Sequence, residues 1–153
     1  MIGTRTPPRA ARRAAGACAA LAVTLGAVSV PAGAATAHHY QFFESPSRNI
    51  GCAIIGGTAR CDILARSWSP GPRPKSCPRI VDYGQGLIVG TTGAARLVCA
   101  GDTAANPSAP VLAYGQADVI GALSCSSATA GMTCRSSRSG HGFFISRQRY
   151  RIF

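Results

Sequence analysis

Six cysteines after residue 50 constrain the fold of this chain more than any other feature of its sequence. An even number of cysteines in a small domain is typical of a disulfide framework formed in an oxidising compartment. Metal–thiolate sites need short Cys-x2-Cys spacings, and the sequence contains none. We therefore predict three disulfides among Cys52, Cys61, Cys77, Cys99, Cys125 and Cys134.

The segment between Cys52 and Cys61 predicts a hairpin that brings these two cysteines together. Gly56 and Gly57 stand at its midpoint, and two central residues that accept a positive φ are what a type I′ turn requires. Counting back from this turn places Cys52 opposite Cys61 in a non-hydrogen-bonded pair, where the Cα atoms lie about 4.5 Å apart. A disulfide can form at that separation.

Cys125 and Cys134 have the same spacing, which predicts a second hairpin closed by a disulfide. Its turn chemistry is weaker, because only Gly131 readily adopts a positive φ. Elimination then joins Cys77 to Cys99. In the chain-entropy description, each short loop contributes roughly 2.7 kcal/mol and the longer loop about 3.4 kcal/mol to stability. The reduced protein is therefore expected to be marginally stable or unfolded.

Composition and local pattern indicate the fold class. The hydrophobic content of 46% is too high for a disordered tail, and the charged content of 14% is too low for a coiled coil or a ribosomal-type basic protein. Short β-rich runs recur between turn signals, without sustained helical periodicity. We predict an all-β fold, a small disulfide-stapled antiparallel barrel or sandwich with little helix. The predicted strands are Tyr40–Phe43, Ile50–Ile55, Ala59–Leu64, Leu87–Val89, Ala95–Cys99, Val111–Tyr114, Leu123–Ser126, Met132–Arg135 and Phe143–Arg149.

A proline-rich connector interrupts the predicted strands between residues 70 and 78. Its cysteine, Cys77, is expected to fasten it to the domain. Trp68 lies just before the connector, and its large apolar side chain predicts a lid over the edge of the core more readily than a ligand platform.

The first 37 residues have the three-part pattern of a secretory signal peptide. An apolar stretch runs from Ala14 to Val30, and Ala35-Thr36-Ala37 offers small residues for cleavage. Cleavage after Ala34 fits almost as well, and an uncleaved anchor is the alternative, although a spanning helix needs ~20 apolar residues. The basic start contains Arg5, Arg9, Arg12 and Arg13.

These features predict a signal peptide at residues 1–37 and a single exported, disulfide-rich β domain at residues 38–153. We expect a secreted or cell-envelope protein without a stable membrane span after cleavage. The whole chain carries a formal net charge of +11, and the signal segment contains four arginines and no acidic residue. Its cleavage would therefore leave the exported domain strongly basic.

Several segments match motifs of a known group of proteins. Residues 43–52 read FESPSRNIGC, and residues 140–143 read GHGF before Ser146, Arg147 and Tyr150. They resemble the F-x-SPSGNI-x-C opening and the GHGF-x-x-SR-x-x-Y close of an uncharacterised family of small exported actinobacterial proteins. The resemblance implies a disulfide-bonded exported domain and supplies no activity or catalytic residue. Arg48 stands where the family pattern has Gly, so a positive-φ turn there is less favourable. Similar middle motifs begin at Cys61, Gly84, Cys99 and Leu112.

The C-terminal segment is the densest basic part of the chain. If residues 143–149 and those after them form one strand, Arg147, Arg149 and Arg151 share one face, and Tyr150 and Ile152 share the other. Such a stripe could hold anionic groups, whereas the alternative is a solvated face that protects an edge strand. Candidate partners are anionic envelope lipid, wall polymer or another exported protein. Nucleic acid is not expected, because export separates the protein from the genome.

A copper site is a second hypothesis. Cleavage after Ala37 would make His38 the N-terminal residue, and its amine and imidazole could chelate Cu(II) together. His141 is the candidate third ligand. The alternative is a frayed N-terminus without a metal-binding role.

Hydrolysis is a third hypothesis, and it has the weakest support. His141 lies among Ser139, Ser146 and Arg147, but no G-x-S-x-G nucleophile motif is present. Asp102 is expected to cap the following loop rather than to act as a catalytic acid. We therefore expect a non-enzymatic secreted or cell-envelope binding module with a basic face and no cofactor. An exported copper-binding or hydrolytic protein is the alternative.

Overall fold

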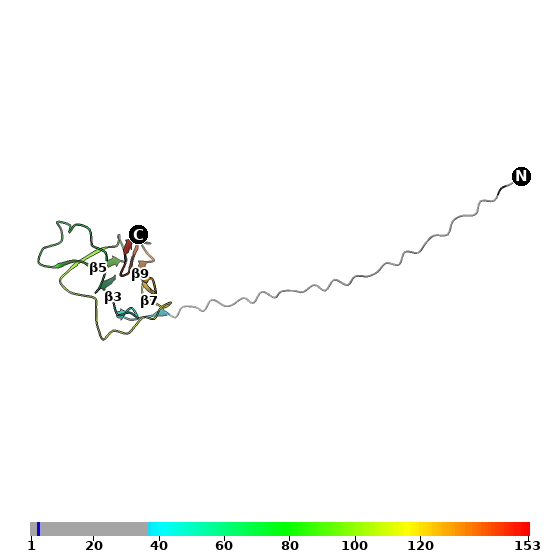
Figure 1. Cartoon of the computed structure of the whole chain (residues 1–153), viewed down its shortest axis with the longest axis horizontal. Helices are drawn as coiled ribbons and strands as arrows, with labels where there is room; N and C mark the ends of the chain where they lie inside the picture. The colour runs from blue at the N-terminus through cyan, green and yellow to red at the C-terminus, as the bar shows by residue number, and fades with distance from the viewer. Residues whose placement is uncertain (1–2, 4–36) are drawn as a thin grey trace. The chain divides into compact units, whose positions relative to one another are not determined.

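The computed structural model describes residue 3 and residues 37–153 (Figure 1). The chain divides into two units, residues 1–32 and residues 33–153, and the fold described here belongs to the second. The predicted signal segment, with Cys18 and the alternative cleavage site after Ala34, lies outside the described residues apart from Gly3 and Ala37. Among the described residues, no helix is long and apolar enough to cross a membrane.

The described residues form β-strands and no helix, as the sequence predicts. One sheet has the strand order β1-β7-β8-β9-β10-β11, and the other has the order β2-β3-β4-β5-β6. All neighbouring strands are antiparallel except β1 and β7. The strands are β1 (Ala37–His38), β2 (Phe42–Glu44), β3 (Ile50–Ile55), β4 (Thr58–Ile63), β5 (Asp82–Gly90), β6 (Arg96–Ala100), β7 (Ala117–Ile120), β8 (Leu123–Ala128), β9 (Gly131–Ser136), β10 (Gly142–Ile145) and β11 (Tyr150–Ile152).

The two sheets pack face to face as a sandwich. Strands β4 and β5 contact β8, β9 and β10 across the core, and no strand pairing joins the two sheets among the described strands. Of the two architectures that the sequence leaves open, the protein therefore adopts the sandwich. The core is filled by inward-pointing side chains, among them Phe43, Leu87, Leu123, Met132 and Phe143, all at most 1% exposed.

The disulfides join the same pairs of cysteines that the loop lengths predict. Cys52–Cys61 and Cys125–Cys134 each link directly opposed residues of one hairpin, with Cα–Cα distances of 4.1 and 4.0 Å. Cys77–Cys99 spans 5.8 Å between Cα atoms and fastens the proline-rich connector to β6. Both hairpin disulfides are buried, whereas the third joins the buried Cys77 to the exposed Cys99. The cross-links therefore stabilise each sheet separately and hold the longest connector in place.

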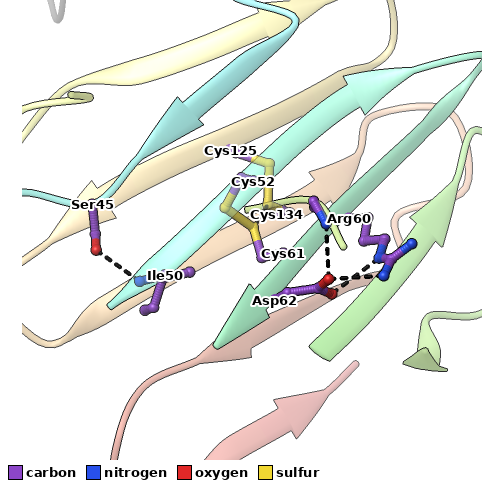
Figure 2. The surroundings of a disulfide bond; sticks show 9 residues. Ser45, Ile50, Cys52, Arg60, Cys61, Asp62, Cys125 and Cys134 are labelled. Carbon is purple, nitrogen blue, oxygen red and sulfur yellow. Dashed lines mark hydrogen bonds and ion pairs between the residues drawn. A yellow bond between two sulfur atoms is a disulfide. The ribbon is translucent and has the colours of Figure 1, made fainter. Parts of the chain in front are cut away.

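The two hairpin disulfides meet in the middle of the core (Figure 2). The Sγ atoms of Cys61 and Cys134 are 3.4 Å apart, although these residues belong to different sheets. Because both hairpins place their cysteines on the inner face, packing of the sheets stacks one bond on the other. The sulfurs thus contribute to the interface between the sheets as well as to each hairpin.

The two hairpin turns differ in their glycine chemistry. Gly56 and Gly57 have φ values of 58° and 74°, which fits the predicted type I′ turn. The second hairpin turns at Thr129 and Ala130, which do not adopt a positive φ, and Gly131 begins the next strand. Gly131 has the positive φ that the sequence predicts, 146°, and a Cβ there would also collide with the backbone of Ile145. This glycine therefore serves both the end of the turn and the close approach of the strands.

Two strand predictions are wrong. Val111–Tyr114 forms only an isolated bridge between Val111 and Glu44, whereas the neighbouring segment 117–120 forms β7. The predicted strand Phe143–Arg149 ends at Ile145 and resumes as β11 after a turn. Ser146 closes this turn, because its backbone N–H and its hydroxyl both donate to the carbonyl oxygen of Arg149, at 2.9 and 3.1 Å.

Trp68 covers the edge of the core, in agreement with its predicted role as a lid. Its indole N–H donates to the carbonyl oxygen of Ser146 at 2.8 Å, and its ring centroid lies 4.7 Å from that of Tyr150. The guanidinium of Arg66 lies 4.6 Å from the indole centroid on the same side of the connector. The tryptophan therefore joins the start of the connector to the β10–β11 hairpin.

Arg48 adopts a positive φ, although arginine makes such a turn less favourable. Its φ is 55°, and it is the one residue other than glycine that has a positive φ among the described residues. The guanidinium lies 3.2 Å from the carboxylate of Glu44, which is buried beneath the loop. The turn thus forms with arginine at this position, and an L-residue in this conformation costs about 1 kcal/mol or more.

We expect R48G to be more stable than R48A by about 1 kcal/mol, because both variants lose the ion pair with Glu44 and only glycine relieves the positive φ. Urea unfolding of the two variants measures this difference, and the shared loss of the side chain makes each the control of the other. An R48A variant as stable as R48G would show that the backbone at this position is not strained.

Candidate functional site: a basic outer face and an adjacent cleft

The predicted basic strand is in fact a hairpin that separates its arginines. Arg147 lies in the turn between β10 and β11, Arg149 ends this turn, and only Arg151 lies within a strand. The hydrogen bonds of Ser146 to Arg149 fold the chain back at this point. The prediction that Arg147, Arg149 and Arg151 share one strand face is therefore corrected: Arg147 points to a different part of the surface.

The outer face of the six-stranded sheet carries the other two arginines. Phe143 and Ile145 are buried in the core, so the alternation of β10 directs Phe144 outward, and Phe144 pairs with Arg151 of β11. The guanidinium carbon of Arg149 lies 5.7 Å from the ring centroid of Phe144, and that of Arg151 lies 5.2 Å from the ring centroid of Phe153. Two arginines thus lie over two aromatic rings.

Arg135 extends this surface into the neighbouring strand. It pairs with Gly142 and is exposed, while Met132 and Cys134 on alternate positions of β9 are fully buried. We call Arg135, Phe144, Arg149, Arg151 and Phe153 the basic outer face. Arg135, Phe144 and Phe153 were missed from the sequence, because their common face depends on the pairing of β9 with β10 and β11.

The arginines of the basic outer face form no ion pair among the described residues. Within the described part of the chain, the ion pairs involve only Arg48 and Arg60 as cations. The arginines of the face are exposed, so their cation–π contacts contribute only about 0.5–1 kcal/mol each. Unpaired cations on one face attract anions over several ångströms in solution.

Arg147 lines a cleft beside the basic outer face. The cleft has a volume of about 360 Å³ and lies between the loop after β2, the β8–β9 turn and the β10–β11 turn. Its lining is polar and contains one guanidinium and no carboxylate. The lining residues are Ser45, Ser47, Asn49, Ile50, Tyr114, Ala128, Thr129, Ala130, Gly131, Ser146, Arg147 and Gln148.

The two candidate copper ligands belong to separate parts of the six-stranded sheet. His38 of β1 begins a row of paired residues across the sheet, His38–Asp118–Cys125–Cys134–Phe143. Phe143, at the other end of this row, follows His141 by two residues. Four strand spacings of about 4.8 Å separate the ends of this row, a distance of about 19 Å. The backbones of His38 and Phe143 are therefore well separated in this row, and the copper site stays a prediction.

The remaining candidate metal and hydrolytic residues have structural roles. The sulfurs of Cys52, Cys61 and Cys134 lie within 4.8 Å of one another, but all three are oxidised in disulfides and are not thiolate ligands. The backbone N–H of His141 donates to Ser139 Oγ at 3.3 Å. Among the described residues, no carboxylate bonds the imidazole of His141, so a Ser–His–Asp arrangement is not assembled.

Asp62, rather than Asp102, holds the loop that follows β6. The carboxylate of Asp62 is buried and accepts hydrogen bonds from the hydroxyl of Thr103 at 3.1 Å and the backbone N–H of Ala104 at 2.9 Å. It also accepts two bonds from Arg60, at 3.0 and 2.8 Å (Figure 2). The predicted loop-capping role of Asp102 therefore belongs to Asp62.

Asp102 instead forms an exposed ion pair with Arg60, at 2.7 Å. The hydrogen bond and charge of Arg60 lower the pKa of the Asp102 carboxyl below its usual range. Burial alone would lower the pKa of the Arg60 guanidinium. The hydrogen bonds of this group to Asp62 and Asp102 outweigh burial and raise its pKa above the usual value. These three residues form a structural clamp between β4 and the loop after β6, away from the basic outer face.

The sequence signature of DUF6636, a family of unknown function, matches residues 20–153. The chain belongs to this family. The match confirms the resemblance to an uncharacterised family, and it spans all three disulfides of the sandwich. No curated protein and no solved structure matches the chain.

Three of the segments that carry the family resemblance contribute to the cleft. Its lining takes Ser45 to Ile50 from the opening motif, Tyr114 from a middle motif, and Ser146 with Arg147 from the closing motif. These segments are far apart in the sequence and meet because β2 and β10 begin or end at the same side of the sandwich. In this DUF6636 domain, the cleft and the basic outer face are the two surfaces whose chemistry suits a ligand.

Proposed function

We propose that this DUF6636 domain is an exported, non-enzymatic binding module that attaches to anionic lipid surfaces through its basic outer face. The observation that carries this proposal is the set of three exposed arginines around Phe144 and Phe153, none of which forms an ion pair among the described residues. Three disulfides support an oxidising, extracytoplasmic location.

The chemistry of the face favours a lipid headgroup layer among the anionic partners considered. Aromatic rings insert at the boundary between headgroups and acyl chains, and arginines bind the phosphates above them. Each basic residue near an anionic membrane surface contributes about 1 kcal/mol. The pair Arg149 and Arg151 should therefore contribute about 2 kcal/mol, a factor of roughly 30 in affinity.

We expect R149Q/R151Q to bind anionic vesicles about 30-fold more weakly than the unaltered chain, while the thermal transition changes little. Co-sedimentation of the full chain with phosphatidylglycerol-containing vesicles measures the effect. The matched control is K75Q/R79Q, which removes the same charge from exposed residues of the connector.

Binding should weaken steeply with salt, and pure phosphatidylcholine vesicles should not bind. An equal loss in the connector variant would mean that net charge alone drives attachment. Binding to purified wall polymer but not to vesicles would assign the face to a different partner and overturn the lipid proposal.

A further inference from the structure

We propose that the cleft beside the β10–β11 turn binds an anionic sugar unit whose carboxylate or phosphate is held by Arg147. This site differs from the basic outer face in its residues and its ligand. The volume of about 360 Å³ falls within the range of small-molecule sites, about 300–1,000 Å³, and leaves room for one or two sugar rings.

The position of Arg147 is fixed, and its charge is free. Its carbonyl oxygen accepts hydrogen bonds from the backbone N–H and the hydroxyl of Ser67, at 2.8 and 3.1 Å. Ser146 closes the same turn through Arg149. Within the described part of the chain, no carboxylate pairs with the guanidinium of Arg147. An anion at this point meets a guanidinium that extends from an anchored backbone, and its planar fork suits carboxylate and phosphate oxygens.

Oriented hydroxyl groups line the opposite wall. Ser45 is only 5% exposed, and its oxygen accepts the backbone N–H of Ile50 at 3.1 Å (Figure 2). The hydroxyls of Ser45 and Ser47 are 3.1 Å apart. One of these two hydroxyls donates to the other, so the pair keeps one O–H proton available to a ligand.

Tyr114 adds an apolar surface at the mouth of the cleft. This residue is 46% exposed, the highest value among the described Phe, Tyr and Trp residues. An exposed ring beside hydroxyl groups offers a flat face to the C–H groups of a sugar and a hydroxyl to its oxygens. Thr129 and Gln148 provide further neutral hydrogen-bonding groups.

The charge balance of the cleft favours an anion over a cation. No carboxylate lines it, and the neighbouring carboxylate of Glu44 is buried and turned to Arg48 at 3.2 Å. One guanidinium among neutral hydroxyl and amide groups matches a ligand with one anionic group and several hydroxyls. A uronic acid and a sugar phosphate share this chemistry, so both are tested.

The test is a titration of the full oxidised chain with glucuronate, glucose 6-phosphate, glucose and inorganic phosphate, followed by amide chemical shifts. We expect the anionic sugars to shift residues of the cleft and glucose to bind at least tenfold more weakly, since a charge-assisted hydrogen bond is lost. Tighter binding of glucuronate would identify a carboxylated sugar, and tighter binding of glucose 6-phosphate a phosphorylated one.

Variants separate this site from the proposed lipid surface. R147Q should weaken the anionic sugars at least tenfold and leave vesicle binding nearly unchanged, and R149Q/R151Q should do the reverse. R147K, which keeps the charge and loses the fork, should have an intermediate affinity. Y114A should weaken the sugars without affecting inorganic phosphate, and the thermal transition of each variant checks folding.

Three results would overturn the proposal. Equal affinity for glucose and the anionic sugars would remove the role of Arg147. Equal affinity for inorganic phosphate and the sugars would reduce the cleft to a simple anion site. The absence of shifts in cleft residues at millimolar ligand would show that the cleft holds none of these compounds, whatever the result with vesicles.

Discussion

Reduction of all three disulfides is expected to unfold the β-sandwich at 25 °C. The chain-entropy description assigns roughly 2.7 kcal/mol to each hairpin bond and about 3.4 kcal/mol to Cys77–Cys99. Together these values approach the whole free energy of unfolding of a small domain, ~5–15 kcal/mol. The reduced chain should therefore lose its cooperative transition. Circular dichroism during thermal and urea unfolding, with and without reductant, measures this loss.

Paired variants distinguish the cross-links. C77S/C99S removes the bond that fastens the connector and should lower the free energy of unfolding by about 3.4 kcal/mol. C52A/C61A should lower the free energy of unfolding by more than its short loop predicts, because loss of the Cys61 sulfur leaves a cavity against Cys134. A reduced chain with an unchanged unfolding midpoint would show that the sandwich does not depend on its disulfides.

The second large effect is expected from D62A, which should lower the free energy of unfolding by about 3–5 kcal/mol. Asp62 is 3% exposed and accepts hydrogen bonds from Arg60, Thr103 and Ala104. Its removal leaves a partly buried guanidinium without its main partner, as well as a buried backbone N–H without an acceptor. Urea unfolding measures the change, and hydrogen exchange at Ala104 reports the release of the loop.

D102A is the matched control, because Asp102 bonds the same guanidinium from the surface. Its side chain is 80% exposed, so its loss should change stability by no more than about 1 kcal/mol. Since Arg60 lowers the pKa of Asp102, this small contribution is complete above the ordinary carboxyl pKa and is lost as the pH falls through the lowered value. Equal losses in D62A and D102A would contradict a special role for the buried carboxylate.

Local chemistry made the hairpins and their disulfides predictable. Gly56 and Gly57 determine one turn, and the equal spacing of Cys125 and Cys134 indicates the other. The β7 strand was missed, since the short segment ADVI has neither a turn signal nor clear alternation. This segment forms a strand because it pairs with β8. Pairing between strands is a tertiary effect that a single segment does not encode.

The candidate site was harder to predict, because its residues meet only through strand pairing. Arg147, Arg149 and Arg151 have the spacing of a strand face, but the hydroxyl of Ser146 closes a turn among them. A serine side chain that hydrogen-bonds to nearby backbone groups competes with strand formation, and the periodicity of the sequence does not reveal this competition. Arg135 joins the basic outer face only because β9 pairs with β10.

The contact between the Cys61 and Cys134 sulfurs also bears on the oxidative folding of the chain. A thiolate left at Cys134 could attack the Sγ of Cys61 at this 3.4 Å contact, forming a Cys61–Cys134 bond and releasing Cys52 as the leaving thiolate. That bond joins residues 73 positions apart, whereas each native hairpin bond joins residues 9 apart. Because short loops close at the lower entropic cost, the hairpins can oxidise before the sheets pack. Once both have done so, no free thiol remains at the contact, and the packed core itself is protected from disulfide exchange.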